Sequence, residues 1–243
     1  MNAKNISKFF EYLLLRIRVR RFTWYFGDSR EQGISYAIMQ ENFLGIDDMV
    51  NIFRFVPDDV MLEKMSKVPY DFSTLERYKN NYILVPVLPI SIREIADMYP
   101  WFKSWLLSNY RHNTLSQELS LEESWLDEKP IAGWYLIRKT HFPDSEFKTL
   151  SEQEGLLETC NTIPSAQIIL YAIVGYVLTQ DKLLFKQTGV RTNTIDANNK
   201  NVTISPRFFT NTKKVCETLE VKGMGPDYSQ RQTGIATHLK HTQ

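Results

Sequence analysis

The sequence is poor in cysteine, glycine and proline, and each shortage excludes a class of protein. Its 243 residues hold two cysteines, Cys160 and Cys216, which are too few for a disulfide framework and form no Cys-x-x-Cys motif. Ten glycines and ten prolines are too few for low-complexity linkers. We therefore expect two reduced thiols in a folded chain, with disorder confined to the termini and loop tips.

Long hydrophobic runs are absent as well. The longest apolar run, IILYAIVGYVL, extends from Ile168 to Leu178, so it is too short to span a bilayer and is typical of a buried helix. The N-terminus carries Lys4 and Lys8 but no apolar stretch that ends in a small-residue cleavage site. We expect a cytoplasmic protein that makes no contact with a membrane.

Familiar catalytic motifs are also missing. The sequence contains no P-loop, no Rossmann glycine fingerprint and no HExxH, GxSxG or EF-hand pattern. His238 and His241 have the spacing of one helix face but lack an evident third metal ligand, and His112 and His141 have no nucleophile or orienting carboxylate nearby in the sequence. We predict no catalytic, metal-binding or cofactor-binding residue and no cofactor, while a catalytic site assembled from distant residues stays open.

Neither sign of charge dominates the chain, which has 29 Lys and Arg residues against 28 Asp and Glu residues. Residues 1–30 nevertheless carry a net charge of +5, from seven basic and two acidic residues. Residues 31–129 carry a net charge of −7, from nine basic and sixteen acidic residues. The basic N-terminal segment is therefore a candidate for binding polyanions or for pairing with the acidic segment that follows it.

The basic charge is concentrated in the stretch RIRVRRFTW, which contains Arg16, Arg18, Arg20 and Arg21. The stretch also fits a strand, in which the arginines at 16, 18 and 20 face one way and the apolar residues between them the other. We favour one helix over residues 5–26, in which two apolar stripes divide these arginines. A helix that binds nucleic acid needs its cations on one accessible face, so the pattern disfavours nucleic acid, which stays an alternative partner of the four arginines. We expect the arginine stems to cover apolar surface and the charges to pair with acidic residues between Asp47 and Asp59.

Helix starts are marked by serine followed three residues later by glutamate, which is the capping-box pattern. The pattern occurs at Ser73/Glu76, Ser91/Glu94, Ser120/Glu123 and Ser151/Glu154, so we predict helices that begin near residues 74, 92, 121 and 152. Two further helices are predicted between residues 47 and 66, divided at Pro57, with Asp47 and Asp58 in their first turns. Another helix is predicted to begin at Pro100.

Strand patterns appear later in the chain. The run Tyr82–Leu88 predicts a strand at a sheet edge, because it contains Pro86, and Gly133–Thr140 predicts a second strand. VRTNTI and VTISPRFF flank the polar loop at residues 196–200 as the strands of a hairpin would, and KKVCETLEV predicts a further strand. These strands suit a small antiparallel sheet in the second half of the chain.

The fold class follows from the distribution of these elements. The segment from Pro164 to Gln180 is nearly apolar all round, so it predicts a helix at the centre of a core. We predict an α+β fold with a mostly helical region over residues 1–129. An α+β region over residues 130–243 would pack its buried helix on a small antiparallel sheet. The two regions are separate domains or one continuous domain.

Four segments of the chain are NYILVPVLPISI, GWYLIRKTHFPDS, KTLSEQEGLL and IPSAQIILYAIVGYVL. Together with LLF and VRT, they resemble parts of a family of bacterial hypothetical proteins that has no known activity, over roughly residues 80–195. The resemblance implies a bacterial origin and no mechanism. It does not extend to the N-terminal arginine segment or to the C-terminal tail.

Aromatic residues make up 13% of the sequence, and WYF at residues 24–26 and YPWFKSW at residues 99–105 are more than a small core needs. We therefore expect a non-enzymatic binding or assembly protein that self-associates or binds a protein partner. The alternative is an enzyme or a binder of a small anion, with its site in the C-terminal hairpin and tail, where loops on a rigid sheet concentrate binding residues. The ligand contacts would be Arg191, Arg207, Asp227 and Arg231.

Overall fold

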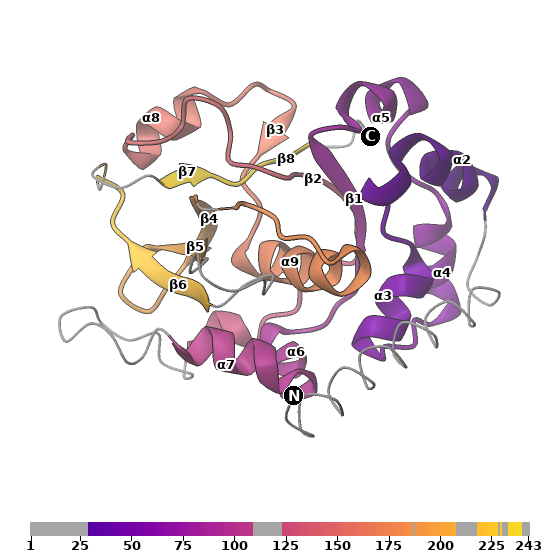
Figure 1. Cartoon of the computed structure of the whole chain (residues 1–243), viewed down its shortest axis with the longest axis horizontal. Helices are drawn as coiled ribbons and strands as arrows, with labels where there is room; N and C mark the ends of the chain where they lie inside the picture. Colours follow the sequence, from indigo (N-terminus) through magenta and orange to yellow (C-terminus); the bar gives the residue numbers. More distant parts are fainter. Residues whose placement is uncertain are drawn as a thin grey trace, which may run out of the picture.

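Two β-sheets and several helices make up the part of the chain that the computed structural model describes, which is residues 29–108, 123–186, 188–207, 218–227, 229 and 233–239 (Figure 1). This architecture confirms the predicted α+β fold class. The helix predicted over residues 5–26, the helix start predicted at Ser120 and the thiol of Cys216 lie outside the described residues.

Each sheet has four strands within the described residues. Sheet A is antiparallel and has the order β1-β2-β8-β3, with strands β1 (Tyr82–Val87), β2 (Gly133–Arg138), β8 (His238–Leu239) and β3 (Asn161–Thr162). Sheet B has the order β6-β5-β4-β7, with strands β6 (Thr218–Met224), β5 (Asn201–Arg207), β4 (Gly189–Ile195) and β7 (Thr233–Ile235). In sheet B, β4 runs antiparallel to β5, as the predicted hairpin requires, and parallel to β7.

The C-terminal residues join the two sheets, which no sequence pattern predicts. β7 lies beside β4 in sheet B, and shortly after it β8 lies between β2 and β3 in sheet A. Between these strands, the Ala236 amide donates to the Arg191 carbonyl and the Arg138 amide donates to the Thr237 carbonyl. One short segment therefore pairs with both sheets, so the single small antiparallel sheet expected from the sequence is two sheets, one of them mixed.

Most of the described helices precede β2 in the chain. Their bounds are α2 (Arg30–Met39), η1 (Gln40–Asn42), α3 (Ile46–Phe53), α4 (Asp59–Ser66), α5 (Phe72–Tyr78), α6 (Ile92–Met98), α7 (Pro100–Ser108), η3 (Ser124–Leu126), α8 (Leu150–Gly155) and α9 (Ala166–Gln180). Figure 1 places α9 near the centre of the molecule, with sheet B on one side and the group α2–α5 on the other. Because α9 contacts β1, β4, β5 and α3, it is the central helix that its apolar sequence predicts.

Side-chain caps determine where several helices begin. Ser91 forms the predicted capping box, since its hydroxyl accepts from the Glu94 amide and the Glu94 carboxylate accepts from the Ser91 amide. The helix starts predicted near residues 74 and 152 are two residues late, because Asp71 caps α5 and Thr149 caps α8. In both helices a residue two positions before the predicted serine takes the cap position.

Close contacts hold α9 against the elements around it. The rings of Phe53 and Tyr171 stack with their centroids 4.2 Å apart, and the Tyr171 hydroxyl donates to the carbonyl of Pro86 over 3.2 Å. Gly175 lets α3 approach closely, because a β-carbon at this position would lie 3.0 Å from the sulfur of Met49. The regions before and after residue 130 therefore share a hydrophobic core, and the pairing of β1 with β2 joins them in one sheet.

Candidate functional site

Two adjoining hollows at β2 and β8 form the candidate site. The first, of about 550 Å³, lies at the N-terminus of α9, and the second, of about 670 Å³, lies beside the end of α4. Ile131, Tyr135 and His238 line both hollows, so we treat the two as one site and name it the Tyr135 groove. Each volume lies in the range of about 300–1,000 Å³ that is typical of ligand sites.

The wall between the two hollows is built by the neighbouring strands β2 and β8. Successive side chains of a strand point to opposite faces, so Trp134 and Tyr135 lie on opposite faces of β2. Trp134 is buried and lines the second hollow, whereas the half-buried Tyr135 lines both hollows. The Trp134 indole N–H donates to the Met65 carbonyl over 2.8 Å. The Tyr135 ring lies edge-on to His238 at 5.3 Å, and its hydroxyl donates to the Ile131 carbonyl over 3.1 Å. Burial raises the pKa of the Tyr135 hydroxyl, which therefore stays a hydrogen-bond donor at neutral pH.

The N-terminus of α9 lines the first hollow. Ser165 caps the helix by accepting from the Ile168 amide over 3.4 Å, and the Ala166 amide donates to the Thr194 hydroxyl over 2.9 Å. The aligned peptide dipoles of this 15-residue helix place a partial positive charge at its first turn. This end of the helix therefore favours a negatively charged group nearby.

A hydrogen-bond network fixes the loop that carries Ile131. Gln167 Nε2 donates to the Trp125 carbonyl over 3.0 Å and to the Glu128 carboxylate over 3.1 Å. Gln167 Oε1 accepts from the Thr194 hydroxyl over 3.2 Å. Because Gln167 is buried, leaving one of these groups unpaired would cost about 1–3 kcal/mol. The loop before β2 is thereby attached to the first turn of α9.

Two exposed isoleucines border the groove. Ile131 is 76% exposed and Ile195 is 47% exposed, and both line the first hollow. A partner that covers apolar side chains removes them from water, which contributes favourably to binding. This rim is therefore suited to apolar side chains of a partner.

The charges around the groove are mostly positive. Lys64 and Lys67 line the second hollow, are exposed, and form no ion pair with any residue that the structure describes. Lys129 in the first hollow is compensated by Glu94, whose carboxylate lies 3.3 Å from its Nζ. Glu128, the acidic residue of the lining, already accepts a hydrogen bond within the fold. An acidic partner would supply the charge that compensates Lys64 and Lys67.

Arg191, which the sequence predicts as a ligand contact, is buried in β4. Its Nη1 donates to Gln153 Oε1 over 3.1 Å and to the Lys148 carbonyl over 3.4 Å. Burial lowers the pKa of the guanidinium, since it disfavours the charged form. Gln153 in α8 is itself fully buried and also donates to the Thr233 carbonyl. The Arg191 side chain therefore packs inside the fold, out of reach of a ligand in solvent.

The structure does not bring Arg207 and Asp227 together. Arg207 pairs with Thr218 at one end of the β5–β6 ladder, whereas Asp227 follows Met224, which pairs with Asn201 at the other end. At about 3.3 Å per residue, the ends of this ladder are about 20 Å apart. The remaining residues that the sequence suggests as ligand or nucleic-acid contacts lie outside the described residues; they are Arg16, Arg18, Arg20, Arg21 and Arg231.

His141 has an acidic neighbour that sequence reasoning overlooked. Its Nε2 lies 3.5 Å from Glu146 Oε1, five residues further along the chain. The neighbouring Ser145 is fully buried, and its hydroxyl donates to the Phe142 carbonyl and accepts from the Ile235 amide. Ser145 therefore has a structural role in joining this turn to β7.

The groove residues themselves were not found from the sequence. Ile131 is one apolar residue in a loop, and nothing in its neighbours shows that it borders a hollow. His238 reaches the site because β8 pairs with β2 and β3, which are distant in the sequence. The half-buried Tyr135 beside the buried Trp134 is the one local signal, because alternation in a strand puts such neighbours on opposite faces.

Metal and thiol chemistry have little support among the described residues. No group of three His, Cys, Asp or Glu side chains in this part of the chain is placed to hold a metal ion. His112 and His241 lie outside it. Cys160 is a free thiol, and burial together with the nearby Glu158 raises its pKa, so it is protonated at neutral pH. No helix in the described ranges is long and apolar enough to cross a membrane.

The sequence matches no family model, no curated protein and no solved structure. The resemblance of roughly residues 80–195 to bacterial hypothetical proteins therefore stays a prediction. The shape, the apolar rim and the charge of the Tyr135 groove are the features from which a function can be argued.

Proposed function

We propose that the protein is a bacterial cytoplasmic binding or assembly protein whose Tyr135 groove holds an acidic, partly apolar segment of a partner protein. One observation carries this function: the exposed Ile131 lies in the same groove as Lys64 and Lys67, which pair with no described residue. A non-enzymatic role is supported by Tyr135 and Gln167, whose polar atoms are already engaged within the fold.

The form of the groove favours an extended segment as its occupant. Its two hollows share a wall, so side chains of one segment can enter each hollow while the backbone crosses Ile131 and Tyr135. A carboxylate in the second hollow would pair with Lys64 and Lys67, and the N-terminus of α9 would favour another in the first. Such charge complementarity fixes the orientation of the partner and raises its association rate.

Selection from a library of short random peptides on the immobilised protein tests this function. We expect the enriched sequences to combine Asp or Glu with large apolar residues, because the groove offers lysines and an isoleucine rim. Peptides selected in this way should bind at least tenfold more weakly to Ile131→Asp. Val56→Asp is the matched control, since Val56 is also 76% exposed but lines neither hollow.

Enrichment of basic peptides, or equal loss of binding in the two variants, would contradict the proposed function. Sedimentation of the wild-type protein and the two variants measures their oligomeric state, which tests whether a second copy of the chain occupies the groove. If the wild-type protein and Val56→Asp form a dimer that Ile131→Asp does not form, the groove binds a second copy rather than a separate partner.

A further inference from the structure

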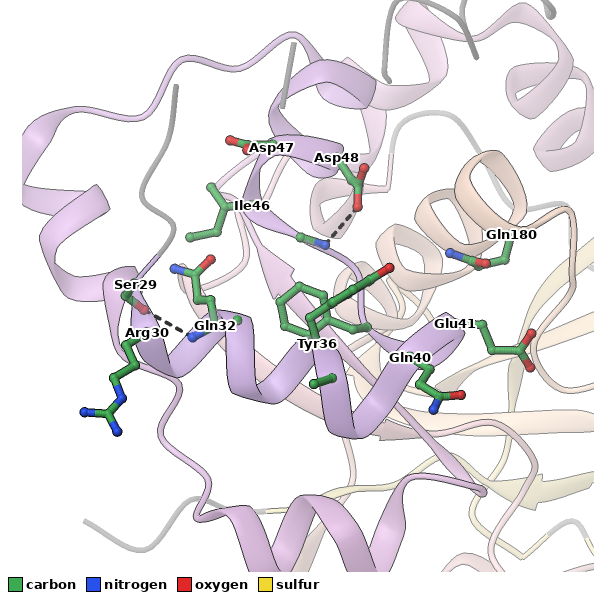
Figure 2. Close-up of a pocket in the computed structure, with 14 residues that line it drawn as sticks. Ser29, Arg30, Gln32, Tyr36, Gln40, Glu41, Ile46, Asp47, Asp48 and Gln180 are labelled. Atoms are coloured by element: carbon green, nitrogen blue, oxygen red, sulfur yellow. Dashed lines mark hydrogen bonds between the residues drawn. The ribbon is translucent and has the colours of Figure 1, made fainter. Parts of the chain in front are cut away.

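A third hollow, of about 960 Å³, lies between α2 and the start of α3 (Figure 2). We name it the α2 hollow. The lining residues used below are Ser29, Tyr36, Ala37, Phe43, Asp47 and Asp48. None of its lining residues also lines the Tyr135 groove, so the occupant of one site does not determine the occupant of the other.

An exposed aromatic ring spans the centre of the α2 hollow. Tyr36 is 62% exposed although it lies within α2, and its ring is held edge-on to Phe43 with the centroids 5.9 Å apart. Figure 2 shows the Tyr36 ring in the middle of the hollow, beneath Asp48. The face of a fixed tyrosine ring attracts cations and also gains from apolar cover.

The charged side chains that face the α2 hollow are acidic. Asp47 and Asp48 lie in the first turn of α3, and the Asp48 carboxylate accepts from the Gly45 amide over 3.0 Å. Partial burial raises the pKa of Asp48, because it removes water that would stabilise the charged carboxylate. A cation beside the carboxylate would replace that stabilisation. Arg30, the basic residue of the lining, points away from the hollow (Figure 2). The acidic side chains and the exposed ring together favour a cationic side chain as the occupant of the hollow.

The described chain begins at this hollow. Ser29 is both the N-terminal cap of α2 and part of the lining, and residues 1–28 hold six basic against two acidic residues. Tyr36 follows Ser29 by seven residues, which span about 10 Å of α2. Arg21 precedes Ser29 by eight residues, which span about 12 Å as a helix, the form predicted over residues 5–26, and more when extended. The stretch RRFTWYF, residues 20–26, is therefore close enough to Ser29 along the chain to reach Tyr36.

We propose that the α2 hollow is occupied by residues 20–26 of the same chain, with Arg20 or Arg21 between Asp48 and Tyr36. An arginine in this place makes a charge-assisted hydrogen bond to the carboxylate and lies over the ring. The segment is tethered beside the hollow, so its effective concentration there is on the order of millimolar. Docking of this kind withdraws the two arginines from nucleic acid and compensates the charge of the Asp48 carboxylate.

Disulfide formation within the full chain tests this docking. The native thiols are removed by Cys160→Ser and Cys216→Ser, and Thr23→Cys is paired with Ala37→Cys, because Ala37 is exposed and lines the hollow. We expect the intramolecular disulfide to form at least tenfold faster than one between Thr23→Cys and Glu31→Cys, because Glu31 is half-buried in α2 and nearer in the chain but does not line the hollow. Equal rates for the two cysteine pairs overturn the docking.

Charge variants of the first cysteine pair show whether arginine is responsible. Arg20→Glu with Arg21→Glu should slow disulfide formation at least tenfold, and Asp48→Asn should slow it several-fold. Arg16→Glu with Arg18→Glu makes the same change in net charge outside the docked stretch and should leave the rate within twofold of the unmodified pair. Equal effects of the two double variants overturn the assignment to residues 20–26.

Amide hydrogen exchange tests the docking without any cysteine variant, so its result does not depend on whether those variants fold. In the chain with native cysteines, Arg20→Glu with Arg21→Glu should speed amide exchange in residues 30–48 and leave β5 unchanged. Faster exchange that is confined to residues 30–48 supports the docking. Unchanged exchange there, or a uniform increase over both regions, contradicts it.

Discussion

Burial decides the role of single residues in this fold. Arg191 and Asp227 are both polar residues of the C-terminal half, yet Arg191 is enclosed and hydrogen-bonded to Gln153, whereas Asp227 is exposed in a turn. The sequence places Arg191 in a strand, but it does not show that α8 covers the strand. Trp134 and Tyr135 are adjacent and both aromatic, but they lie on opposite faces of β2, so Trp134 is buried and Tyr135 is half-buried.

Two glycines differ in what an added methyl group would meet. At Gly234 in β7, a β-carbon would lie 2.5 Å from the Cβ of His141 and 2.6 Å from Ser145 Oγ, whereas nothing lies within 4 Å at Gly33 in α2. We expect Gly234→Ala to lower the free energy of unfolding by about 1–3 kcal/mol through overpacking. Gly33→Ala should raise it by about 0.5–1 kcal/mol, because alanine is a better helix former. Urea unfolding measures both changes. If Gly234→Ala left the free energy of unfolding unchanged, β7 would not be packed against the turn that carries His141 and Ser145.

At the scale of elements, caps and edges were predictable from the sequence and short strands were not. Pro86 predicts that β1 lies at a sheet edge, which the order of sheet A confirms. Asp58 predicts the start of a helix, and it caps α4 by accepting from the Met61 amide. β8 has two residues, too few for the alternation that identifies a strand. Its place between β2 and β3 depends on contacts from distant parts of the chain.

Tyr70 supplies hydrogen bonds where β2 meets β8. Its hydroxyl donates to the Leu239 carbonyl over 3.0 Å and accepts from the Leu136 amide over 3.1 Å. Tyr70→Phe leaves these buried backbone groups without that partner, so we expect the free energy of unfolding to fall by about 1–3 kcal/mol. Tyr135→Phe is the control, because the bond from its hydroxyl to Ile131 is exposed and its loss should cost less. Thermal unfolding compares the two, and equal losses would show that Tyr70 does not hold β8 in place.

At the scale of the whole molecule, the site is built from both halves of the chain. The second half supplies β2, β8 and the N-terminus of α9, and the first half supplies Lys64 and Lys67. Patterns within either half cannot show that these parts meet, which is why the sequence suggests a binding role without locating it. The charge gradient is more informative, because an acidic hollow does lie where the basic segment, residues 1–28, joins the described chain.

The two lysines of the groove determine which charge it prefers in a partner. Lys64→Glu with Lys67→Glu reverses the charge of the second hollow, so acidic peptides selected on the wild-type protein should lose at least tenfold in affinity. Salt screens exposed charges, so the difference should be largest at low ionic strength. Lys186→Glu with Lys200→Glu makes the same change outside the groove and should leave the affinity within twofold. Fluorescence anisotropy of one labelled peptide at two salt concentrations measures all three proteins, and undiminished binding by the first variant would leave the apolar rim as the sole source of affinity.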